Sequence, residues 1–145
     1  MKLADQQLLF QLFHDGTITK IKKEENDYTF SVDIVYLAAR VHPQFRYFQI
    51  RLVGTTDFYF EDSDFKHVIK GFNEIQRLEF EVFSVESKAD HLKIFCSSDE
   101  GDLGFFVIKT DHIIVYDQES RILELVEMER IAREYWKDFE KRVGH

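Results

Sequence analysis

Residues 28 to 36 alternate large apolar side chains with polar ones, and this alternation constrains the fold more than any other feature of the sequence. The segment is YTFSVDIVY, with Thr29, Ser31 and Asp33 between apolar neighbours. Successive side chains of a strand point to opposite faces of its sheet. One face of this segment is therefore apolar and the other polar, as is typical of antiparallel sheets with one solvated face.

Seven further segments have the composition and periodicity of strands. They are residues 17–23, 46–53, 56–61, 77–87, 91–97, 103–109 and 112–116. Residues 24–27 form the turn of a hairpin that joins the first of them to residues 28–36. A link centred on Gly54 predicts that 46–53 pairs with 56–61. A change of phase predicts a bulge near Val82 and Phe83, or a strand that is covered on both sides.

Three segments have helical spacing. Residues 3–13 fit a short helix, with a strand over 8–14 as the alternative, and residues 64–72 fit one or two turns opened by Ser63 or Asp64. Residues 120–142 predict a long helix with one apolar stripe. The stripe consists of Leu125, Met128, Ala132, Tyr135, Phe139 and Val143.

These elements predict an α+β fold: a mainly antiparallel, strongly curved sheet or open barrel of about eight strands, with a short N-terminal and a long C-terminal helix packed on it. Pro occurs once and Gly six times, and no linker divides the chain. We therefore expect a single domain over residues 1–145. The 15 Phe residues suit the core of such a wide sheet.

The charge balance excludes some partners. The formal net charge is −8, from 27 acidic and 19 basic residues. The basic cluster Lys20, Lys22 and Lys23 is followed at once by acidic residues, so we expect no nucleic-acid binding. One Cys, no signal peptide and no membrane-spanning stretch favour a bacterial type of cytoplasmic protein.

The sequence shows no motif for catalysis, a metal or a cofactor, and none that identifies a family. The six His residues are scattered without metal-ligand spacing. Cys96 alternates with Leu92 and Ile94, which predicts a buried, inert thiol. We therefore expect no metal, no cofactor and no catalytic residue, and favour a non-enzymatic protein.

The acidic excess is concentrated in residues 54–64 and 97–102, which contain no basic residue. The first segment includes a Tyr that alternates outward between two Phe residues. An exposed Tyr among carboxylates predicts a docking surface for a basic protein, as in an inhibitor or immunity-like protein. The predicted partner-binding residues are Asp57, Tyr59, Glu61, Asp62, Asp64, Asp99, Glu100 and Asp102.

Two other functions fit the same pattern. A sheet that curls against a helix could enclose a small molecule between aromatic rings. The rings expected for such a pocket are Tyr36, Phe48, Phe58 and Phe105. A structural role is the third possibility, with a dimer formed through the wide face of the C-terminal helix.

Overall fold

The computed structural model describes residues 1–63 and 68–144, and in these residues eight strands and four helices form one antiparallel sheet with its covering helices. The strands are β1 (Thr17–Glu24), β2 (Asp27–Asp33), β3 (Tyr47–Asp62), β4 (Ile69–Lys70), β5 (Phe80–Lys88), β6 (His91–Ser98), β7 (Leu103–Tyr116) and β8 (Ile122–Leu123). The helices are α1 (Leu3–Leu12), α2 (Val35–Ala38), α3 (Phe72–Ile75) and α4 (Leu125–Val143). The predicted fold class is confirmed, with its short N-terminal and long C-terminal helix.

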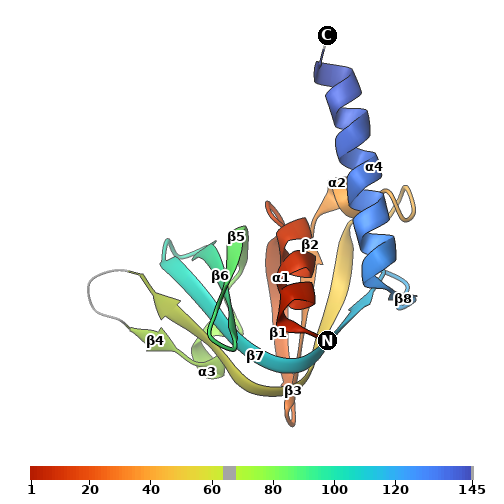
Figure 1. Cartoon of the computed structure of the whole chain (residues 1–145). Helices are drawn as coiled ribbons and strands as arrows, with labels where there is room; N and C mark the ends of the chain where they lie inside the picture. Colours follow the sequence, from red (N-terminus) through yellow and green to blue (C-terminus); the bar gives the residue numbers. More distant parts are fainter. Residues whose placement is uncertain (64–67, 145) are drawn as a thin grey trace.

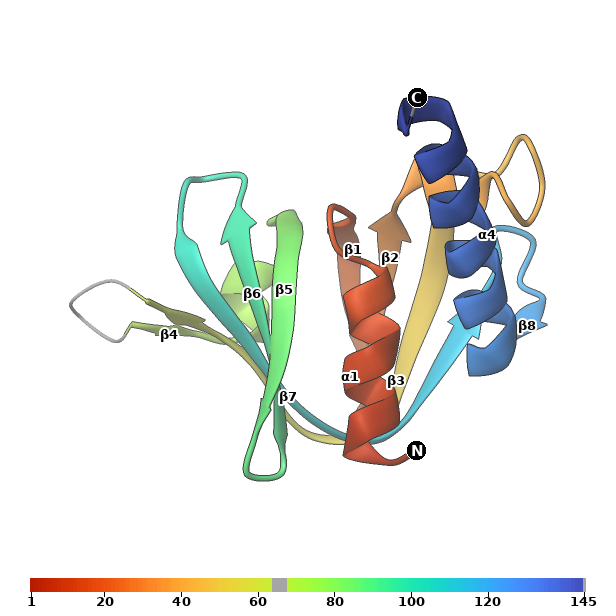
Figure 2. The same cartoon turned by 45° about the horizontal axis from the view of Figure 1, so that its top comes forward.

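The sheet returns on itself because β3 pairs with β7 as well as with its neighbours β2 and β4. The strand order is β4-β3-β2-β1-β5-β6-β7-β8, and β3 also pairs with β7. β3 and β7 are long and bent, and they cross between the two halves of the molecule (Figures 1 and 2). One half carries β1, β2, β8 and the helices α1, α2 and α4; the other carries β4, β5, β6 and α3.

The inward residues of the ring form an aromatic core. In β3, Phe48, Phe58 and Phe60 are buried, and the rings of Phe60 and Phe80 have their centroids 5.2 Å apart. α1 adds Phe10, whose ring centroid lies 6.3 Å from that of Phe30. Edge-to-face and tilted packing of this kind suits a wide, curved interior.

The predicted pairing of residues 46–53 with 56–61 is wrong, because both belong to the single strand β3. Gly54 lies within this strand at φ 65°, where the chain bends rather than turns back. The two segments predicted over 103–109 and 112–116 are likewise one strand, β7. Gly signals a turn in a sequence, but a bend or bulge in a long strand has the same signal.

The segment predicted as helical over 64–72 also differs. Residues 64–67 lie outside the described residues, so Asp64 cannot be placed. Of the remainder, Ile69–Lys70 forms β4 and the helical turn α3 begins at Phe72. The hydroxyl of Ser63 donates to the Leu103 carbonyl oxygen at 2.8 Å.

Other local predictions are confirmed. Residues 3–12 are helical, so the alternative strand over 8–14 is wrong. The register of β5 against β6 shifts between Val82 and Ser84, which is the predicted bulge. α4 begins at Leu125, later than predicted, because Ile122 and Leu123 pair with β7. No helix in the described part of the chain is long and apolar enough to span a membrane.

Candidate functional site

The two acidic segments meet at one end of the sheet, although about forty residues separate them in sequence. Asp62, near the end of β3, is the register partner of Gly104 in β7. The backbone N–H of Ser63 donates to the carbonyl oxygen of Leu103 at 2.9 Å. The acidic loop 99–102 directly precedes this contact, so both segments share one edge of the molecule.

Lys70 lies at this edge and neutralises one of the carboxylates. Its ammonium group donates to Asp102 Oδ2 at 2.7 Å. This hydrogen bond raises the pKa of Lys70, and the charges of Glu100 and Asp62 raise it further. The same contact lowers the pKa of Asp102. Asp102 therefore stays ionised within an ion pair and presents little free charge to a partner.

The loop itself is held by Ser98. Its hydroxyl oxygen accepts hydrogen bonds from the backbone N–H groups of Glu100 and Asp102, at 3.2 and 3.1 Å. Asp99 accepts from the backbone N–H of Glu79 at 3.2 Å. Such local hydrogen bonds fix the loop backbone, so the carboxylates are presented in one arrangement.

Asp57 lies apart from this acidic edge. It is four residues before Glu61 in β3, a distance of roughly 13 Å along a strand. Its Oδ2 lies 2.6 Å from His91 Nε2, and the other ring nitrogen of His91 lies 2.9 Å from Asp90. The sequence gives no signal for this pair, because it depends on the register of β6, β7 and β3.

Tyr59 lies on the outer face, between the buried rings of Phe58 and Phe60. Its pKa is raised by partial burial and then by the nearby charges of Glu61 and Asp57. Its register partner in β7 is Val107, and Val107 in turn faces Lys93 of β6. This row of side chains borders an aromatic surface on the same face.

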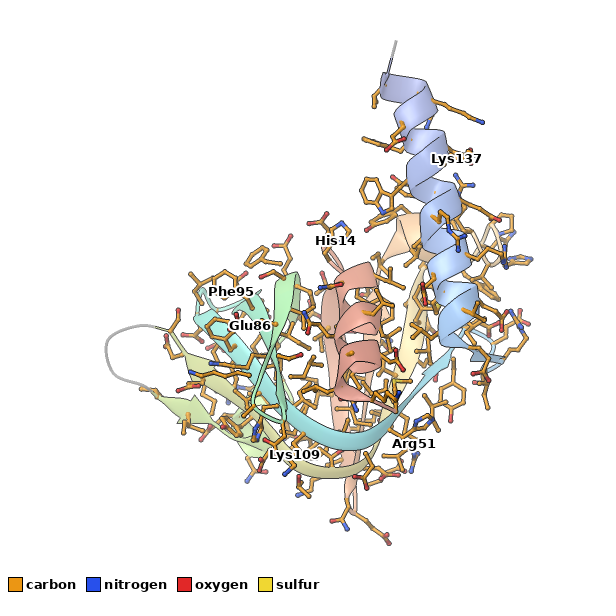
Figure 3. The ribbon with its side chains drawn as sticks, viewed as in Figure 1. His14, Arg51, Glu86, Phe95, Lys109 and Lys137 are labelled. Carbon is orange, nitrogen blue, oxygen red and sulfur yellow. The ribbon has the colours of Figure 1, made fainter. Side chains whose placement is uncertain are left out.

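The outer aromatic patch (Phe83, Phe95, Leu103 and Phe105) lies beside the acidic edge and was not predicted from the sequence. Ring centroids are 5.8 Å apart between Phe83 and Phe95, and 5.2 Å apart between Phe95 and Phe105. Phe83 is 40% exposed and Leu103 is 39% exposed. Phe95 and Glu86 project from this half of the sheet (Figure 3).

The patch and the acidic edge are joined through direct neighbours. Glu61 is the register partner of Phe105, and Leu103 follows Asp102 in the chain. Lys93 Nζ lies 4.6 Å from the centre of the Phe105 ring, so one cation borders the patch. The sequence contains one indication of this patch: residues 103–109 are apolar on both faces of the strand. Because only one face can point into the core, the apolar side chains of the other face must lie on the outside.

The four rings predicted for a pocket are not brought together. Phe48 and Phe58 are buried in the core, whereas Phe105 lies on the outer face. Tyr36 lies in α2, where its ring centroid is 4.5 Å from that of Tyr135 in α4. Burial, with the charges of Asp15 and Tyr135, raises the pKa of Tyr36 to about 12. The four rings are thus divided between the core, the outer face of the sheet and the contact of α2 with α4, and they do not line one cavity.

The predicted burial of Cys96 is confirmed, and desolvation raises the pKa of its thiol to about 12. A thiol with this pKa is protonated at neutral pH and is a poor nucleophile. Within residues 1–63 and 68–144, no three His, Cys, Asp or Glu side chains are grouped closely enough to hold a metal ion.

Comparisons with models of protein families, with curated protein sequences and with solved structures find no match to this chain. The arrangement itself combines an exposed apolar centre with a rim of carboxylates. Protein-binding surfaces commonly have an aromatic centre and a polar rim. The site is therefore suited to recognising another macromolecule.

Proposed function

We propose that this protein is a binding protein that captures a basic protein partner on the outer face of β3, β5, β6 and β7. The observation that carries the proposal is the position of the outer aromatic patch directly beside the acidic edge (Glu61, Asp62, Asp99, Glu100 and Asp102). Contiguous exposed apolar surface is uncommon on a soluble monomer and marks interaction sites. The carboxylates around it would select a partner of opposite charge.

Several of these carboxylates are available to a partner. Among the described residues, Glu61 and Glu100 form no ion pair, while Asp102 is bound to Lys70. Charges at the rim of an interface mainly raise the association rate, whereas buried aromatic side chains supply most of the affinity. We therefore assign steering to Glu61 and Glu100, and anchoring to Phe95 and Phe105.

A specific form of this function is inhibition, in which the face masks a basic surface that the partner needs for its own activity. A nuclease, with a cationic substrate-binding surface, is a partner of this kind. The net charge of −8 supports rapid capture of such a protein at low ionic strength.

The test is affinity capture from the source cells, with the captured protein identified by mass spectrometry. The charge-reversal variant Glu61→Lys/Glu100→Lys should reduce capture of a basic protein by about tenfold or more, because two attractive rim charges become repulsive. Phe95→Ser should reduce capture at both low and high salt. The charge variant should lose most at low salt, where electrostatic interactions are strongest.

Matched controls are available on α4. Glu140→Lys reverses an exposed charge, and Val126→Ser removes an apolar side chain that is 70% exposed. Both controls should capture as well as the wild type, and all variants should keep its melting temperature within a few degrees. The proposal would be overturned if the captured partner were acidic. It would also be overturned if the Glu61/Glu100 and Phe95 variants retained the partner as well as the wild type does.

A further inference from the structure

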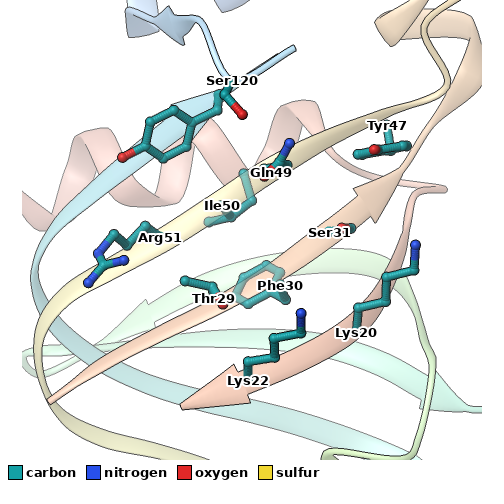
Figure 4. A pocket seen from close by; sticks show the side chains of 11 residues that line it. Lys20, Lys22, Thr29, Phe30, Ser31, Tyr47, Gln49, Ile50, Arg51 and Ser120 are labelled. Atoms are coloured by element: carbon teal, nitrogen blue, oxygen red, sulfur yellow. The ribbon is translucent and has the colours of Figure 1, made fainter. Parts of the chain in front are cut away.

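A second surface, in the other half of the molecule, forms a groove of about 410 Å³ with polar and aromatic lining residues. Its floor is the outer face of β1, β2, β3 and β7, and Figure 4 shows the side chains that line it. This volume falls in the range of small-molecule sites, roughly 300 to 1,000 Å³. The groove shares no lining residue with the outer aromatic patch or the acidic edge.

Strand register determines how the groove is built. Ser31 of β2 faces Gln49 of β3, and Gln49 faces Tyr116 of β7. In the next row, Lys22 of β1 faces Thr29. Hydroxyl and amide groups thus form the floor, with lysines at the β1 side and a phenol ring at the β7 side. Three strand spacings separate these sides, a distance of roughly 14 Å.

Lys20 reaches this surface through a bulge in β1. The register against β2 shifts between Thr19 and Lys22, and Lys20 has φ 55°. The extra residue lets Ile18 and Ile21, three positions apart, both be buried, and it leaves Lys20 and Lys22 exposed on the outer face. A left-handed backbone is unfavourable for Lys, and bulges commonly re-aim side chains next to functional sites.

The two lysines are the unneutralised cations of the groove. Within the described residues, neither Lys20 nor Lys22 has an ion-pair partner, whereas Arg51 is bound by Asp27 at 2.7 Å and by Glu24 at 3.4 Å. Lys20 Nζ lies 5.8 Å from the centre of the Tyr47 ring, so a cation and an aromatic face adjoin. The residues that line the groove include no Asp or Glu. An anion that enters the groove would therefore meet two ammonium groups and no carboxylate among them.

We propose that this groove binds a mononucleotide, with its phosphates at Lys20 and Lys22 and its base against Tyr116. Lysine ammonium groups bind phosphate as point charges, and tyrosine rings stack on the flat face of a base. Gln49 and Ser31 offer hydrogen bonds to the sugar between them. A long nucleic acid is disfavoured, because two free lysines on a chain of net charge −8 give few phosphate contacts.

The experiment is an NMR titration of the full-length protein, labelled with nitrogen-15, with ADP, pyrophosphate, adenosine and a short single-stranded oligothymidylate. ADP should shift the backbone amide signals of Lys22, Ser31 and Gln49, and should bind about tenfold or more tightly than pyrophosphate or adenosine, since only ADP reaches both sides. Lys20→Ala/Lys22→Ala and Tyr116→Leu should each weaken ADP binding about tenfold.

Lys88→Ala is the matched control, because Lys88 is an exposed lysine in β5, outside the groove. This variant should bind ADP as the wild type does, and the spectra of all variants should show the native fold. The proposal is overturned if ADP causes no shifts at millimolar concentration, or if the Lys20/Lys22 variant binds it unchanged. Equal affinity for pyrophosphate, or tighter binding of the oligothymidylate, would also overturn it.

Discussion

At the scale of single residues, Gly54 shows how the long strand β3 can pass between the two halves. Its φ of 65° is in the left-handed region, and a Cβ at this position would overlap the Asp111 carboxylate. Its backbone N–H donates to Asp27 Oδ1 at 3.1 Å, and the next residue, Thr55, shares a hydrogen bond with Thr110 at 3.0 Å between hydroxyl oxygens. The bend is thus fixed by close packing as well as by backbone conformation.

Replacing Gly54 with Ala should destabilise the protein more than replacing either of two other glycines. We expect a loss of about 1 to 2 kcal/mol in the free energy of unfolding from backbone strain, plus a smaller loss from displacing the exposed Asp111 side chain. Gly101→Ala has the strain alone, at φ 91° with open space around the Cβ, and should lose about 1 kcal/mol.

Gly71→Ala completes the series, because Gly71 has φ −85° and nothing within 4 Å of its Cβ position. It should leave stability unchanged. Urea unfolding of the three variants measures the order. A loss for Gly54→Ala no larger than that for Gly101→Ala would show that Asp111 moves aside and that packing does not fix the bend.

The sequence could predict some site residues and not others for a physical reason. The outward position of Tyr59 and the buried position of Cys96 follow from alternation with neighbours whose burial is clear. Phe105 lies in a strand that is apolar on both faces, so alternation cannot say which face is covered. The contact of His91 with Asp57 depends on long-range register, which no local pattern contains.

At the scale of elements, α4 was predicted well because its signals are local. Its apolar stripe has helical spacing, and the backbone N–H of Glu124 donates to Glu127 Oε1 at 3.3 Å, which caps the first turn. The C-terminal end of α4 extends beyond the rest of the molecule (Figure 1). Phe139 and Val143 are exposed there, at 36% and 64%. A dimer through this helix stays a prediction.

The two sides of α4 should respond differently to truncation. Met128 is fully buried, so Met128→Ala should cost about 2 to 5 kcal/mol in the free energy of unfolding through lost burial and a cavity. Val126 lies two residues earlier and is 70% exposed, so Val126→Ala should change it by less than about 0.5 kcal/mol. Thermal or urea unfolding measures both. Equal effects would mean that α4 packs against α1 and α2 less firmly than the burial of Met128 indicates.

The sequence predicted which residues are extended better than it predicted where each strand begins and ends. Residues 46–62 contain two clear apolar alternations around Gly54, and both a hairpin and a bent single strand satisfy them. The bent single strand forms because β7 pairs with β3 from Gln49 to Asp62, which a hairpin over these residues would not allow. A partner so distant in sequence leaves no trace in the local pattern.

At the scale of the whole molecule, the strand pairs that close the ring differ in how many residues they pair. β3 pairs with β7 along most of its length, but β1 and β5 are paired at Thr17 with Glu81 and Ile18 with Phe80. The contact between β1 and β5 is extended by two backbone hydrogen bonds, from Asp15 N–H to the Val82 carbonyl oxygen and from Val82 N–H to the Gly16 carbonyl oxygen, both at 2.8 Å. This short seam is where the ring can open with the fewest hydrogen bonds broken.

Native-state hydrogen exchange should therefore show the seam opening before the molecule unfolds. The amides of Asp15 and Val82 should exchange through a sub-global opening with a lower free energy than amides near the centre of the β3–β7 pairing, such as those of Leu52 and Ile113. Low concentrations of denaturant separate the two classes, because a sub-global opening exposes less surface and so depends less on denaturant. Equal free energies of opening for all four amides would mean that the ring unfolds as one cooperative unit. The packing of α1 against β5 would then hold β1 and β5 together as firmly as hydrogen bonds hold the other strand pairs.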